Sequence, residues 1–110
     1  MAYDEQLATR VRDVLGGEEG VTEKRMFGGL AFLVDGHLAV SASSRGGLLV
    51  RVDPARNDAL LEEAGVAPFE MRGRAMTGWL HVSPAAVEDE DALERWVGLA
   101  LGFARTLGPG

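Results

Sequence analysis

Residues 23–40, EKRMFGGLAFLVDGHLAV, contain the signals that decide the fold. Two apolar runs flank Asp35-Gly36, a dipeptide typical of a two-residue turn between antiparallel strands. The double glycine Gly28-Gly29 separates the first of these runs from a third segment with strand character. Consecutive strands joined by such short connections pair antiparallel. We therefore predict antiparallel strands over residues 22–27, 29–34 and 37–42.

Further elements are predicted on both sides of this stretch. Apolar residues at helical spacing predict a first helix over residues 3–15. Asp53-Pro54 places a capping residue before a proline at a first helical position. The acidic run Glu88–Asp91 suits the start of a third helix that ends near Leu107. A short second helix is predicted over residues 54–64, and the remaining strands over residues 48–52, 69–72 and 77–82.

This order of elements predicts a two-layer α+β fold with the sequence α-β4-α-β2-α. The connections are too short for parallel crossovers except across the second helix, so the sheet should be mainly antiparallel, with the helices packed on one face. The chain has 110 residues and a mass of 11.7 kDa, which leaves room for one hydrophobic core. We therefore predict a single domain over residues 1–110.

Composition and charge narrow the classes of function. The net charge of -6 argues against direct binding to nucleic acid or to an anionic membrane, because both require neutralisation of phosphate charge. No apolar run approaches the ~20 residues needed to span a bilayer, and the acidic N-terminus lacks an export signal. The default expectation is a cytoplasmic protein. The absence of cysteine excludes disulfides, thiolate nucleophiles and cysteine-based zinc sites.

The strands carry one candidate binding surface. Alternation predicts a core face with Leu30, Phe32 and Val34, together with Leu38 and Val40, and an opposite face that the helices leave open. Guanidinium groups and aromatic rings would share this open face, a combination suited to carboxylates, phosphates or a partner protein. The alternative is that the long side chains only cover the sheet. The candidate binding residues are Arg25, Phe27, Gly28, Gly29, Arg51, Trp79 and His81.

The double glycine does not match a phosphate-binding loop. Gly28-Gly29 fits neither the dinucleotide-binding nor the P-loop pattern, and an expected strand follows it where a helix N-terminus would be required. Glycine here is better explained by a tight reversal, a bulge or the close approach of another backbone.

No group of residues in the sequence supports a catalytic or metal site. His37 and His81 belong to no metal-binding spacing, and the serines lack the nucleophile-elbow motif. The carboxylates of Glu62-Glu63 and Glu88–Asp91 suit helix surfaces and helix starts. We therefore expect no enzyme, no metal and no cofactor.

The third helix has an unusually broad apolar side. Trp96, Leu99 and Phe103 extend the main stripe sideways, beyond what one contact with a sheet requires. Either the helix is cradled within the monomer, or the margin of the stripe is a homodimer interface.

Four blocks in this order carry a family resemblance: VTEKRMFGGLAFLVDGHLAV, LLVRVDP, GRAMTGWLHVSP and LERWVGLALGFAR. Over residues 3–107 the chain resembles the TfoX (Sxy) N-terminal domain family of bacterial regulators of natural competence. The resemblance implies a fold similar to that of the secretion chaperones, and no catalytic residue or cofactor. The full-length regulators also have a helical C-terminal domain, so we expect a stand-alone single-domain member.

Two functions remain open from the sequence. The first is a non-catalytic regulatory or adaptor domain that acts through protein-protein contacts, with protein partners of unknown identity. The alternative is a small-ligand-binding domain that uses the cationic-aromatic sheet face. A concave pocket with convergent polar groups would favour the alternative.

Overall fold

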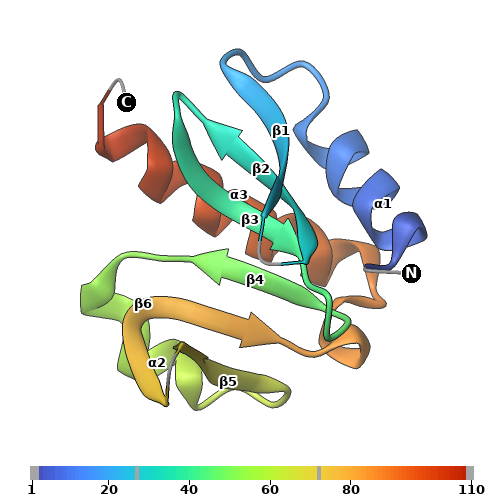
Figure 1. Ribbon diagram of the computed structural model, residues 1–110. Coiled ribbons are helices and arrows are strands. Elements are labelled where there is room, and N and C mark those ends of the chain that lie inside the picture. The colour runs from blue at the N-terminus through green and yellow to red at the C-terminus, as the bar shows by residue number, and fades with distance from the viewer. Residues whose placement is uncertain (1–2, 27, 72, 109–110) are drawn as a thin grey trace.

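Six strands form one antiparallel sheet, and the helices pack against one of its faces (Figure 1). The computed structural model describes residues 3–26, 28–71 and 73–108. The sheet order is β1-β2-β3-β4-β6-β5. The predicted α+β class with a mainly antiparallel sheet is confirmed.

The strands are β1 (Val21–Met26), β2 (Gly29–Val34), β3 (His37–Ala42), β4 (Leu48–Arg51), β5 (Val66–Met71) and β6 (Arg74–Val82). The helices are α1 (Glu5–Leu15), α2 (Asn57–Leu61), α3 (Glu90–Thr106) and the short 3-10 turns η1 (Pro54–Arg56) and η2 (Pro84–Val87).

The turn between β2 and β3 is the one that the sequence predicts. Asp35 and Gly36 have φ angles of 52° and 87°. Positive φ at both central residues is the geometry of a two-residue hairpin turn whose twist matches that of the strands. The backbone N–H of Asp35 also donates to the carbonyl oxygen of Gly20, which ties the turn to the loop before β1.

Helices α1 and α3 cover the core face of the sheet. Phe32, Val40 and Val50 project from three neighbouring strands and are fully buried. Side-chain caps fix the start of both helices, because Asp4 accepts hydrogen bonds from the first turn of α1 and Asp89 accepts one from the first turn of α3. The buried residues of α3 are Leu93, Trp96, Val97, Ala100 and Ala104. Most of the apolar stripe of α3 is therefore cradled within the domain.

A β-bulge changes the face of one predicted core residue. Phe32 lies opposite Val40, but the next residue of β2, Leu33, lies opposite Leu38, so that Ala39 is the extra residue. The bulge turns Leu38 to the face away from the helices, where it joins a separate apolar cluster. The prediction that Leu38 shares the core face with Val40 is therefore wrong.

The second half of the sheet is longer than the sequence pattern indicates. β5 begins at Val66, which pairs with Val82, and β6 runs from Arg74. Pro68 lies within β5, and this is tolerated because β5 is an edge strand whose outer side needs no donor. The predicted helix over residues 54–64 is divided between η1 and α2.

β3 and β4 pair over only three residues of each strand. Their register joins residues 40–42 to residues 48–50. Beyond these residues the strands diverge, and the C-terminal half of α3 lies behind the divergence (Figure 1). From this half of the helix, Phe103 lies 5.7 Å from the guanidinium carbon of Arg51. The end of α3 thus contacts β4 at the place where β4 leaves its neighbour.

Candidate functional site

Arg51, Trp79 and His81 share the sheet face away from α1 and α3, as predicted. Arg51 pairs with Trp79 and Leu49 pairs with His81, so these four side chains project from the same face of β4 and β6. The Arg51 guanidinium carbon lies 4.9 Å from the centre of the Trp79 ring. This is a cation-π contact between two predicted site residues.

Arg25 does not belong to this face. It lies opposite Leu30, which is part of the helix-covered core, and Glu23 on the same side of β1 bonds to Arg12 of α1. The prediction that Arg25 shares the open face is therefore wrong. Met26 pairs with Gly29, and this register sets the face of every residue in β1. Phe27, also predicted on the open face, lies outside the described residues.

Gly28 and Gly29 have structural reasons to be glycine. Gly28 has a φ angle of +76°, which residues other than glycine rarely adopt. A Cβ atom at Gly29 would collide with the carbonyl oxygen of Ala42 in β3. The double glycine therefore permits a reversal followed by the close approach of another backbone, which were two of the interpretations offered by the sequence.

The open face is more apolar than the sequence pattern indicates. We define it by the residues that the register and the second apolar cluster place there. Leu38 is 7% exposed and Leu49 is 3% exposed, although α1 and α3 lie on the opposite face of the sheet. Larger, half-buried neighbours pack around them. The open face includes Met26, Ala31, Leu33, Leu38, Ser41, Leu49, Arg51, Phe69, Trp79 and His81.

Both histidines are held by backbone carbonyl oxygens. Nε2 of His81 lies 2.8 Å from the oxygen of Gly46, in the loop between β3 and β4. Nε2 of His37 lies 2.9 Å from the oxygen of Gly108, just beyond α3. Within residues 3–26, 28–71 and 73–108, no three His, Cys, Asp or Glu side chains gather as a metal site would require. The two imidazoles thus fix loops and termini.

Surface ion pairs account for the shifted pKa values. Arg12 Nε donates to Glu23 Oε2 over 2.6 Å, and this hydrogen bond holds the pKa of Glu23 below its ordinary value. Hydrogen bonding from Arg95 lowers the pKa of Glu63 in the same way. These pairs join α1 to β1 and α3 to the end of α2. They stabilise the packing of helices and give no indication of acid-base chemistry.

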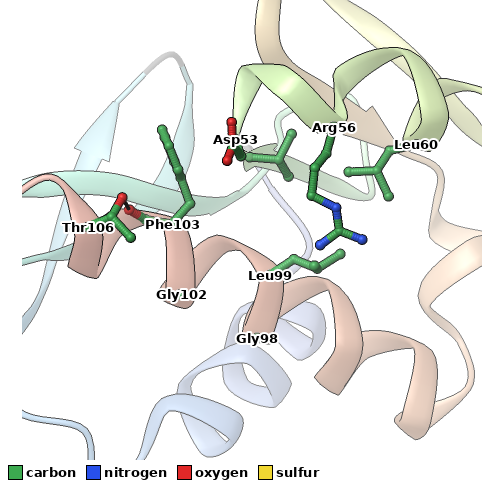
Figure 2. A pocket seen from close by; sticks show the side chains of 9 residues that line it. Asp53, Arg56, Leu60, Gly98, Leu99, Gly102, Phe103 and Thr106 are labelled. Atoms are coloured by element: carbon green, nitrogen blue, oxygen red, sulfur yellow. Dashed lines mark hydrogen bonds between the residues drawn. The ribbon is translucent and has the colours of Figure 1, made fainter.

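A pocket that the sequence reasoning missed opens between α3 and the η1–α2 segment (Figure 2). Its volume is about 280 Å³. The pocket lies on the helix side of the domain, and its lining joins segments about 45 residues apart in the chain. Two glycines within a predicted helix were the local sequence signal for it. The main lining residues are Arg56, Leu60, Gly98, Leu99, Gly102 and Phe103.

Comparison with known proteins gives one result. A family model described as the TfoX N-terminal domain matches residues 13–104. The matched region begins near the end of α1 and includes all six strands and most of α3. Neither the curated proteins nor the solved structures give a significant match.

Proposed function

Since the chain belongs to the TfoX N-terminal domain family, we propose that it is a non-catalytic regulatory or adaptor domain acting through protein-protein contacts. The observation that carries this proposal is the apolar cluster on the open face. A sheet face that meets only water usually carries polar side chains. Here Leu38 and Leu49 are buried beneath half-buried Leu33, Phe69 and Trp79. Clustered apolar side chains on an uncovered face are typical of interaction sites.

The charge beside the cluster indicates what a partner would offer. Arg51 lies over the Trp79 ring and forms no ion pair with any described residue. In contrast, Arg10, Arg12, Arg95 and Arg105 each bond to a carboxylate of this chain. An arginine on an aromatic ring, next to apolar side chains, is a common anchor of protein interfaces. The partner segment should therefore combine apolar side chains with an acidic one.

The test is affinity capture from native cell extract with matched variants. Arg51→Ala and Trp79→Ala alter the open face, while Arg45→Ala removes an exposed arginine from a loop and serves as the control. Proteins retained by the wild type and by Arg45→Ala should be lost from the two open-face variants. Circular dichroism must show that the variants are folded. Retention of every partner by folded open-face variants would contradict this surface assignment.

The small-ligand alternative, with a ligand held on the Arg51–Trp79 face, requires a concave site. The pocket between α3 and η1 lies elsewhere, on the helix side, and raises a separate question. The expected homodimer, the cytoplasmic location and the absence of direct nucleic-acid binding remain predictions. No helix in the described part of the chain has both the length and the apolar character to cross a membrane.

A further inference from the structure

Two glycines in the middle of α3 lack a packing explanation. Gly98 and Gly102 lie one helical turn apart in a helix of 17 residues. A Cβ atom added to either would meet no heavy atom within 4 Å, apart from the neighbours and backbone of its own helix. Glycine weakens a helix interior because it loses more backbone freedom than other residues on folding. An unfavourable local choice without a packing gain often marks a functional position.

The space left by the missing side chains is part of the pocket. Gly98 and Gly102 form its floor on α3, with Leu99 and Phe103 beside them (Figure 2). The η1–α2 segment supplies the opposite wall, including Leu60. The volume of about 280 Å³ is close to the lower end of small-molecule sites. A partner helix, with a diameter of about 10 Å including side chains, is too large for it.

One cation points into this apolar space. The side chain of Arg56 extends from η1 toward α3, and its guanidinium lies near Leu99 and Leu60 (Figure 2). Arg56 is exposed, and no described residue bonds directly to its side chain, although its charge contributes to the lowered pKa of Glu63. A guanidinium that bonds directly to no carboxylate of its own chain and lies beside apolar side chains is suited to a ligand carboxylate.

The acidic group of the pocket limits the charge of that ligand. Oδ1 of Asp53 accepts a hydrogen bond from the backbone N–H of Ala55. Its carboxylate lies at the Phe103 end of the pocket, away from the Arg56 guanidinium (Figure 2). A second negative charge on the ligand would approach this carboxylate and be repelled. The site therefore favours a single anionic group at the Arg56 end and an apolar body toward Phe103.

We propose that this pocket binds a small monocarboxylate with an aliphatic or aromatic body. The carboxylate pairs with Arg56, and the body lies across the backbone of Gly98 and Gly102 against Leu60 and Phe103. Inorganic anions lack the apolar body and gain little from this lining. The proposal concerns the helix side of the domain and stands apart from the protein-contact function of the open face.

The test is an NMR titration of the full ¹⁵N-labelled chain with 3-phenylpropionate. Its neutral isostere, 3-phenylpropan-1-ol, controls for charge. The amide signals of Gly98 and Gly102 should shift in a saturable manner, and the acid should bind at least about fivefold more tightly than the alcohol. Arg56→Gln should remove this difference while leaving the affinity for the alcohol unchanged. Arg74→Gln removes an exposed arginine of β6 that does not line the pocket, and it should have no effect on binding.

A second variant tests the floor of the pocket without loss of the fold. Gly102→Leu places a side chain in the open space and should abolish the shifts while the thermal midpoint stays the same or rises. Binding that is equal for acid and alcohol, or unaffected by Arg56→Gln, would overturn the proposal. The same holds if Gly102→Leu binds the acid normally, or if this substitution changes only the self-association measured by light scattering.

Discussion

The guanidinium carbon of Arg51 lies 4.9 Å from the centre of the Trp79 ring, across the pair of strands β4 and β6. The same carbon lies 5.7 Å from the Phe103 ring, which belongs to α3 on the other side of the diverging sheet. One arginine thus contacts both the open face and the helix layer. Its position allows Arg51 both to bind a partner and to stabilise the domain.

The first prediction is that Arg51 contributes to stability without an ion pair. Arg51→Ala should lower the free energy of unfolding by about 1 kcal/mol, since partly exposed cation-π contacts contribute about 0.5–1 kcal/mol each. Urea denaturation measures the change, with Arg45→Ala as the control. Equal stability of the two variants would show that the ring contacts of Arg51 contribute nothing.

The second prediction concerns the apolar cluster of the open face. Leu49 is 3% exposed although it lies on the sheet face away from α1 and α3. Leu49→Ala should lower the free energy of unfolding by about 2–4 kcal/mol, comparable with Leu80→Ala in the helix-covered core. Chemical denaturation of the two variants provides the comparison. If Leu49→Ala lowers the free energy of unfolding by less than about 1 kcal/mol while Leu80→Ala has its full effect, this face is ordinary solvated surface.

The third prediction contrasts glycines in two settings. Gly102→Ala should raise the free energy of unfolding by up to about 1 kcal/mol, because alanine favours the helix and the added methyl group meets open space. Gly29→Ala should lower it by about 1–3 kcal/mol, because its Cβ atom would collide with the Ala42 carbonyl oxygen. Thermal and urea unfolding measure both. A destabilised Gly102→Ala variant would indicate that the space beside α3 is already filled.

The fourth prediction uses the pair of Arg95 and Glu63. Hydrogen bonding from Arg95 lowers the pKa of Glu63 in the folded protein. The stabilisation is therefore complete above the unfolded-state pKa of about 4.3 and is lost as the pH falls through the lower, folded-state value. Arg95→Gln should destabilise the protein at pH 7 by less than about 1 kcal/mol, because both side chains are partly exposed to solvent.

The pH dependence separates this pair from general effects of charge. The difference in stability between the wild type and Arg95→Gln should shrink on going from pH 7 to pH 3, where Glu63 is increasingly protonated. Arg74→Gln removes an exposed arginine and should show almost no difference at either pH. A difference for Arg95→Gln that persists unchanged at pH 3 would indicate lost packing in place of a lost ion pair.

Local signals explain what the sequence predicted correctly. Asp35-Gly36 specifies its turn through the conformations of two residues, and Asp89 specifies a helix start through a hydrogen bond three residues away. Alternation within β4 and β6 placed Arg51 and Trp79 on one face, because both strands are regular in that region. These features depend on neighbours in the chain.

The incorrect or missed features depend on contacts between distant segments. The bulge at Ala39 alters the pairing of two strands and reverses the side on which Leu38 lies. Arg25 was assigned to the wrong face because the pairing of Met26 with Gly29, which sets the register, could not be derived from alternation within one strand. The pocket requires η1 and α3, which carry Arg56 and Gly102, to lie side by side in the fold, and only the unusual glycines in α3 signalled it locally.

The most direct test of the central claim is site-specific photocrosslinking in the native cells. A photoreactive phenylalanine derivative replaces Leu33, which is half-buried on the open face, or Glu94, which is exposed on α3. The account predicts a discrete protein adduct from position 33 that Arg51→Ala or Trp79→Ala removes, and none from position 94. An adduct from position 94 alone, or one from position 33 that both substitutions leave unchanged, would contradict it.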